Sequence, residues 1–114
     1  MRTVYVSGPI TATSKRQRDK HINIARRYAE RLWKMGFGVL TPHLNDLGME
    51  YNAIPYEHLM KFDLLQVAYM DTIYMLPGWR DSPGAVREFQ LARRLKKPVF
   101  FTLKGAKEWL KKNK

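Results

Sequence analysis

Glu88 is the residue of this chain whose surroundings are best suited to chemistry. It lies in the first two turns of a predicted helix, shortly after a predicted strand that ends at Leu76. Residues three and four positions away on a helix are neighbours, and for Glu88 they are Gly84, Ala85, Leu91 and Ala92. The basic residues nearby occupy other positions, at Arg87, Arg93, Arg94, Lys96 and Lys97. A carboxylate without an ion-pair partner, near the carboxyl end of a strand, indicates a functional site.

Short β-prone runs alternate with helical periodicity along the 114 residues. Strands are predicted at residues 4–6, 37–41, 72–76 and 98–103. Helices are predicted from about residue 19 to a stop at Gly36, from residue 55 or 56, at 83–96 and at 106–112. This alternation predicts one α/β domain over residues 1–114, a Rossmann/flavodoxin-like three-layer sandwich with a four- to five-stranded parallel sheet. Ligands of such folds bind beyond the carboxyl ends of the strands.

Several segments of these elements bear on the site. Ser82 and Pro83 fit the N-cap and the first position of the helix that carries Glu88. Residues 11–18 are predicted to be a polar, basic loop, and residues 42–55 a long loop of the kind that is often functional. The helix that follows is predicted to turn an apolar face inward, formed by Leu59, Phe62, Leu65, Gln66 and Tyr69.

Familiar cofactor motifs are missing from the sequence. No Gly-x-Gly-x-x-Gly follows the first strand, and the segment from Gly8 to Lys15 lacks the second glycine of a phosphate loop. The chain has no cysteine, and His21, His43 and His58 do not have the spacing of metal ligands. We therefore expect no metal and no bound cofactor.

The chain is strongly basic, with 21 Lys and Arg against 10 Asp and Glu and a net charge of +11. This balance favours anionic partners such as phosphorylated metabolites or nucleic acid, although a basic surface that is merely solvated explains it equally well. No apolar run approaches the length needed to cross a bilayer. The sequence enters its first strand at once, so we expect a soluble, cytoplasmic protein without membrane association.

Four segments together resemble the nucleoside 2-deoxyribosyltransferase-like superfamily, which includes the 2'-deoxynucleoside 5'-monophosphate N-glycosidases. The resemblance is nearest to its small phage and bacterial branch and extends from Arg2 to about Phe101. It is carried by Tyr5-Val6-Ser7-Gly8-Pro9-Ile10, Asp63-Leu64-Leu65-Gln66-Val67-Ala68-Tyr69-Met70-Asp71, Leu76-Pro77-Gly78-Trp79 and Ser82-Pro83-Gly84-Ala85-Val86-Arg87-Glu88.

The resemblance implies a role for each matching residue. Glu88 matches the nucleophilic glutamate, Tyr5 the tyrosine that holds this carboxylate, and Asp63 an aspartate assigned to proton transfer. The substrate-binding positions implied in the same way are Ser7, Gly8, Pro9, Ile10, Gly78, Trp79, Ser82, Gly84 and Ala85. A 5'-phosphate is expected near Ser82, with Lys15 and Arg16 as weaker candidates.

These roles predict cleavage of the N-glycosidic bond of a nucleoside or its 5'-monophosphate, by hydrolysis or by deoxyribosyl transfer to another base. Glu88 is expected to stay ionised beside the positive end of its helix. The resemblance also implies a homodimer or larger homo-oligomer.

The alternatives are that Tyr5 only packs in the core, that Asp63 is an exposed helix acid and that Trp79 only covers the sheet edge. The rival function is a non-catalytic nucleotide or nucleic-acid binder, which the scarcity of aromatics among the basic residues disfavours. The base and the need for a 2'-deoxy sugar stay open.

Overall fold

The computed structural model describes residues 1–9, 14–45 and 54–114. Within them the strands are β1 (Thr3–Ser7), β2 (Gly38–Leu40), β3 (Thr72–Met75) and β4 (Val99–Phe100). These four strands form a parallel sheet in the order β2-β1-β3-β4. The chain leaves β1 toward β2 on one side and later returns to β3 on the other. The carboxyl ends of β1 and β3 therefore flank the point where the strand order reverses, which is where ligands bind in such sheets.

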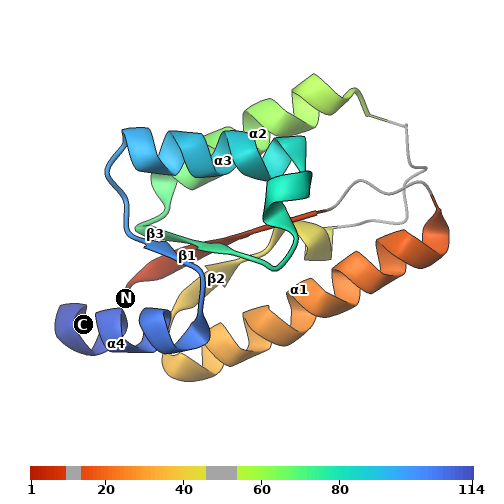
Figure 1. Cartoon of the computed structure of the whole chain (residues 1–114). Coiled ribbons are helices and arrows are strands. Elements are labelled where there is room, and N and C mark those ends of the chain that lie inside the picture. The colour runs from red at the N-terminus through yellow and green to blue at the C-terminus, as the bar shows by residue number, and fades with distance from the viewer. Residues whose placement is uncertain (10–13, 46–53) are drawn as a thin grey trace.

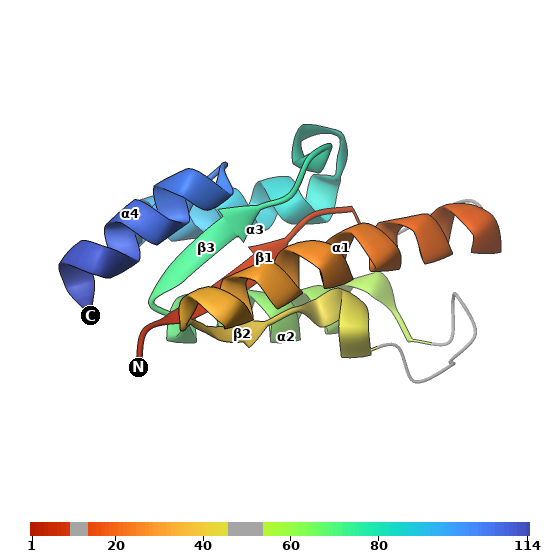
Figure 2. The ribbon, with the colours of Figure 1, turned by 90° about the horizontal axis from the view of Figure 1, so that it is seen from below.

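Helices cover both faces of this sheet, so the predicted three-layer α/β sandwich is confirmed. Figure 1 shows α2 (Tyr56–Tyr69) and α3 (Pro83–Arg94) on one face, with α1 (Lys15–Met35) and α4 (Leu103–Asn113) on the other. The view from below in Figure 2 shows α1 and α4 running along the sheet on the near side. Among the described residues, no helix has the length and apolar character to cross a bilayer.

The central strand β1 is buried on both faces, and its side chains alternate between two cores. Val4 and Val6 pack in the core beneath α1 and α4, while Tyr5 packs in the core beneath α2 and α3. Because side chains two apart on a strand share a face, Ser7 must point to the same side as Tyr5. One strand thus presents a phenol and a hydroxyl to the α3 layer.

Asp71 joins the beginnings of β1 and β3. Its Oδ2 accepts hydrogen bonds from the Thr3 backbone N–H at 2.8 Å and from Thr3 Oγ1 at 3.1 Å. The Thr3 hydroxyl oxygen in turn accepts one from the Asp71 backbone N–H at 2.9 Å. This reciprocal pair fixes the register of the two strands whose opposite ends carry the candidate site.

Helix α1 begins earlier than the sequence predicted. Residues 15–18 were expected to belong to a loop, but Ser14 is an N-cap whose hydroxyl oxygen accepts from the Gln17 N–H, and Lys15 is the first helical residue. The predicted end at Gly36 is confirmed, and the buried residues of the helix are Ala25, Ala29 and Leu32. The cap explains the early start, because it satisfies an N–H that would otherwise lack a partner.

The C-terminal elements differ from the prediction in a similar way. The fourth strand ends at Phe100 instead of residue 103, and α4 begins at Leu103 instead of 106. Thr102 causes the difference, because its hydroxyl oxygen accepts from the Gly105 N–H at 3.0 Å and caps the helix. Helix α3 ends at Arg94, two residues before its predicted end, and Lys96 follows in the left-handed region with φ of 58°.

The predicted inner face of α2 is wrong. The buried residues of this helix are Met60 and Val67, whereas four of the residues predicted to face inward are large, apolar and exposed: Leu59 (45%), Phe62 (56%), Leu65 (67%) and Tyr69 (86%). Apolar residues occur all round α2, so periodicity could not fix which side faces the core. Of the predicted loop at 42–55, the structure shows a short 3-10 helix, η1 (Pro42–Asn45), and residues 46–53 lie outside the described part.

Candidate active site

Glu88 lies in α3 with its carboxyl group turned toward β1, and only 5% of the residue is exposed. Tyr5 donates a hydrogen bond from its hydroxyl to Oε2 at 2.7 Å, and Ser7 donates one to Oε1 at 2.5 Å. Both carboxyl oxygens are therefore held by donors from a single strand. Each oxygen retains a second lone pair, so the group keeps the capacity to react.

Tyr5 was predicted to hold Glu88, whereas Ser7 was predicted only as a substrate-binding residue. The structure places both hydroxyls on the same carboxylate. The period of two along a strand is the signal that sequence reasoning missed. If the residue at position 5 reaches α3, the residue at position 7 faces the same layer.

Burial dominates the electrostatics of Glu88. Desolvation raises the pKa of Glu88 to about 7, against the lowering effect of the hydrogen bonds from Ser7 and Tyr5, and the nearby charge of Asp63 raises it slightly further. The expectation that Glu88 stays fully ionised is therefore wrong. Glu88 is the sixth residue of α3, beyond the first turn where the helix dipole acts. At neutral pH the ionised and neutral forms coexist.

Asp63 is the second acid of the site and lies in α2, where it is half-buried. Burial raises the pKa of Asp63 to about 6. Burial and the two carboxylates, Glu88 foremost, also hold the pKa of Tyr5 well above its usual value, so its phenol remains a hydrogen-bond donor. Two carboxyl groups that titrate near neutrality are typical of acid–base chemistry.

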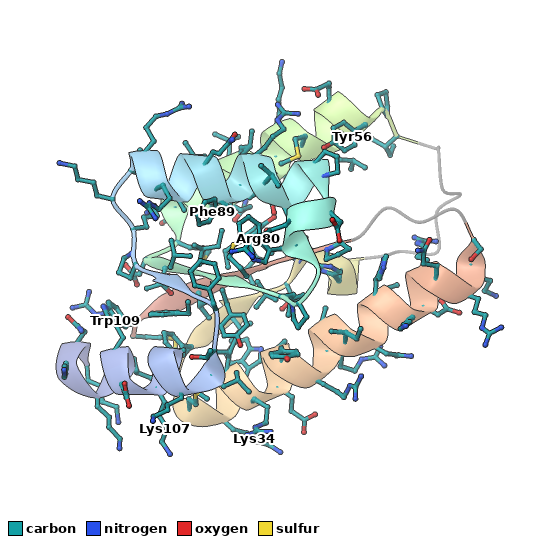
Figure 3. All side chains as sticks on the ribbon, viewed as in Figure 1. Lys34, Tyr56, Arg80, Phe89, Lys107 and Trp109 are labelled. Atoms are coloured by element: carbon teal, nitrogen blue, oxygen red, sulfur yellow. The ribbon has the colours of Figure 1, made fainter. Side chains whose placement is uncertain are left out.

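A pocket of about 90 Å³ lies beside the two acids. It is lined by Gly8, Tyr56, Leu59, Met60, Asp63, Ser82, Gly84, Ala85 and Glu88. Two glycines allow the walls to approach: a Cβ at Gly8 would lie 2.7 Å from Leu76 Cβ, and one at Gly84 would lie 3.1 Å from Tyr56 Oη. Tyr56 stands in the first turn of α2 (Figure 3). Six residues predicted for the site thus meet in this pocket.

Ser82 connects this pocket to a larger hollow of about 390 Å³. Ser82 is the predicted N-cap of α3, and its Oγ accepts from the Ala85 N–H at 3.3 Å. The hollow lies on the α1 side, and its lining includes the predicted residues Pro9, Gly78 and Ser82 together with Gln17, Lys20 and His21 of α1. The three α1 residues were not predicted, because their position depends on where α1 begins and how it crosses the sheet.

Five described residues predicted for the site line neither hollow: Tyr5 and Ser7, which bind the Glu88 carboxyl, and Trp79, Lys15 and Arg16. Trp79 packs against Phe89, with ring centroids 4.6 Å apart, beside the core beneath α2 and α3. Lys15 is exposed at the start of α1, and Arg16 lines a neighbouring depression. Ile10 lies outside the described residues.

His43 contacts Pro9, which follows β1, and was not predicted to take part in the site. It is 2% exposed, and its Nε2 lies 2.8 Å from the carbonyl oxygen of Pro9, to which the neutral ring donates. Burial lowers the pKa of His43 to about 4, so the imidazole is neutral at physiological pH. The residue thereby fixes Pro9, which lines the larger hollow.

The chain belongs to the family described as domain of unknown function (DUF4406), whose model matches residues 2–101. No curated protein sequence matches it. Among solved structures, it is similar to the 2-deoxyribosyltransferase of the psychrotolerant bacterium Bacillus psychrosaccharolyticus. The two share 22% identity with a TM-score of 0.63, over 85% of this chain and 69% of that one. The fold that the resemblance implied is thereby confirmed.

The buried carboxyl of Glu88 predicts an unusual dependence of stability on pH. Because its pKa rises on folding, from an ordinary value near 4.5 to about 7, its contribution to stability is complete below about pH 4.5. That contribution is lost as the pH rises through about 7. Glu88→Gln has no carboxyl group to ionise and does not suffer this loss. The free energy of unfolding of the variant, relative to that of the wild type, should therefore increase by up to roughly 3 kcal/mol from about pH 5 to about pH 8.

Chemical denaturation of both proteins at the two pH values measures this difference in the free energy of unfolding. The neutral His43 contributes with the opposite sign, since a lowered pKa costs stability as the pH falls, but it is common to both proteins and cancels. Parallel stability curves for the variant and the wild type would show that Glu88 is not buried as described.

Proposed function

We propose that this protein cleaves the N-glycosidic bond of a deoxynucleoside or its 5'-monophosphate, with Glu88 as the nucleophile. The observation that supports this most directly is the arrangement of Glu88. Its carboxyl is buried and held at both oxygens by Tyr5 and Ser7, and Glu88 lines a pocket that Asp63 also lines. The shared fold with a 2-deoxyribosyltransferase agrees with this chemistry.

In the first step, an oxygen of ionised Glu88 bonds to the anomeric carbon as the bond from that carbon to the base nitrogen breaks. The electron pair of the broken bond leaves with the base, which takes a proton from Asp63. Positive charge develops on the sugar in the transition state, and a carboxylate held beneath it stabilises that charge. Tyr5 and Ser7 keep the carboxylate in position, so little reorganisation is needed.

In the second step, water attacks the anomeric carbon and releases the free sugar, or a second base attacks and gives a new nucleoside. The ionised Asp63 accepts the proton that the attacking molecule loses, and Glu88 leaves as a carboxylate. Both outcomes use the same first step and the same residues. We propose transfer and hydrolysis as alternatives that one assay separates.

A 5'-phosphate on the substrate fits best near Ser82, at the beginning of α3. The positive end of a helix and its free backbone N–H groups favour anions. Gly84 is at the second helical position, where an N–H has no acceptor within the helix. Lys20 lines the adjoining hollow and supplies a positive charge. The 90 Å³ pocket alone is smaller than common ligand sites, so we place the substrate across both hollows.

Glu88→Gln is expected to abolish release of free base, because the amide cannot bond to the sugar. Wild-type protein is incubated with a panel of deoxynucleosides and their 5'-monophosphates, and the free bases are separated by chromatography. A second free base in the mixture reports transfer through the appearance of a new nucleoside. Glu57→Gln is the matched control, since Glu57 is an exposed glutamate of α2 that pairs with Arg87. Equal activity of the two variants would exclude Glu88 as the nucleophile.

The pH profile should be a narrow bell. The reactive form needs ionised Glu88 and protonated Asp63, and the two groups have pKa values of about 7 and about 6. The value of kcat/KM should therefore peak between these values and fall on both sides. In Asp63→Asn the fall at high pH should disappear, leaving a lower activity that rises through about 7 to a plateau. A variant that retains the fall at high pH would show that another group donates the proton.

We also propose that the exposed apolar face of α2 is covered by a second copy of the chain. Four large apolar side chains on one helix, Leu59, Phe62, Leu65 and Tyr69, expose 45–86% of their area. Such a patch marks an interaction surface. Leu59 also lines the pocket beside Glu88, so a partner on this face would border the site.

Replacing Phe62 and Tyr69 with serine should shift the protein from dimer to monomer, as measured by light scattering over a range of concentrations. Trp33→Ser is the control, because Trp33 is 53% exposed on the opposite helical layer. A monomeric wild type at high concentration would contradict the proposal.

A further inference from the structure

A groove with basic walls runs along α1, from the hollow beside Ser82 to the beginning of α4. Its middle part has a volume of about 410 Å³ and is lined by Ile24, Arg27, Tyr28, Arg31, Pro77 and Leu103. The next part, of about 610 Å³, is lined by Arg31, Lys34, Met35, Leu103, Lys104 and Lys107. Arg31 and Leu103 belong to both parts, and Ile24 also lines the hollow at Ser82. Neighbouring parts thus share lining residues, and we call the three parts together the basic groove.

The cations of the basic groove follow the helical repeat of α1. Arg27, Arg31 and Lys34 are spaced by four and three residues. Lys20 precedes Ile24 by four residues, and Ile24 precedes Arg27 by three, so all of them share one side of the helix. From Lys20 to Lys34 this row extends about 21 Å along the helix axis. Lys107 continues it on α4, and Figure 3 shows Lys34 and Lys107 next to each other on the side of the helices away from the sheet.

These charges are largely uncompensated. Among the residues that the structure describes, Lys20, Arg27 and Arg31 form no salt bridge, and Lys34 pairs only with exposed Glu30 at 3.0 Å. No acidic residue lines the middle part or the part next to α4, although Asp81 lines the hollow at Ser82. Like charges four positions apart destabilise a helix, as for Arg27 and Arg31, so an anion in the groove would relieve a repulsion built into α1.

We infer that the basic groove binds a single-stranded nucleic acid through its phosphates. A row of cations along a channel matches a chain of regularly repeated negative charges better than it matches one phosphate. Because few aromatics accompany the basic residues, the phosphates should supply most of the affinity, while Ile24, Leu103 and Pro77 offer apolar surface to the bases. A concave, one-sided row of Arg and Lys is less suited to a flat bilayer, whose surface helices present a broad apolar face to lipid. This binding does not depend on the proposed reaction.

The test uses a fluorescently labelled single-stranded DNA of about 10 nucleotides, within the range of site sizes of single-strand binders. Fluorescence anisotropy measures its affinity at several salt concentrations. Replacing Arg27 and Arg31 with glutamate should weaken binding at least about tenfold and reduce the salt dependence by about two counterions. Circular dichroism and thermal melting establish that the variants are folded.

The matched control replaces Arg94 and Lys96 with glutamate. These residues are exposed at the far end of the α3 layer, and the control changes the net charge by the same amount. It should alter the affinity less than about threefold, because long-range charge alone is screened by salt. Equal weakening in the control and the groove variant would overturn the inference, since net charge and not the groove would then cause binding.

Two further measurements separate the inference from its rivals. Vesicles containing phosphatidylserine should bind more weakly than DNA at the same salt concentration, and preferential binding to vesicles that is lost in the groove variant would assign the groove to membranes instead. Glu88→Gln should bind DNA like the wild type. If the wild type binds DNA but releases no free base, the result counts against the proposed reaction alone. If it releases free base but does not bind DNA, the result counts against the groove alone.

Discussion

The hydrogen bonds from β1 to Glu88 hold a carboxyl group where burial opposes its charge. Moving a carboxylate out of water is costly unless donors replace the lost hydration. Tyr5 and Ser7 supply two such donors, at 2.7 and 2.5 Å, yet the pKa of Glu88 still rises to about 7. Desolvation therefore outweighs the hydrogen bonds. The site thus holds an acid whose pKa lies near neutral pH, and this depends on the position of β1 beside α3.

Much of this arrangement follows from local sequence. The alternation of strands and helices predicted the parallel sheet, and the Ser82-Pro83 cap predicted where α3 begins and so which residues its first turns carry. Glu88 was singled out because its neighbours at helical spacing are small or apolar, and that same environment is what buries it. Ser7 was recognised only as a neighbour of substrate. The period of two along β1 would have placed it beside Tyr5 once that residue was assigned to Glu88.

What could not be predicted depends on tertiary packing. Helix α2 carries apolar residues all round, so its sequence does not distinguish the side that meets α3 from the side that exposes Phe62 and Tyr69. The starts of α1 and α4 were predicted too late in the sequence. Ser14 and Thr102 cap these helices, but the residues that follow each cap are also compatible with loop or strand. Lys20 and His21 lie within the helix as predicted, but the sequence does not show that this part of α1 packs beside Ser82.

The two helical layers differ in charge, and this difference bears on how an anionic substrate would be oriented. Two carboxyl groups face the pocket between α2 and α3, whereas Lys20 and the basic row of α1 lie on the other side of Ser82. Glu88 and Asp63 repel a phosphate when they are ionised, while the positive field of the α1 side attracts it. A nucleotide would therefore enter with its phosphate toward Ser82 and α1 and its sugar toward Glu88. In the proposed reaction, this charge asymmetry therefore favours the orientation that brings the sugar to Glu88.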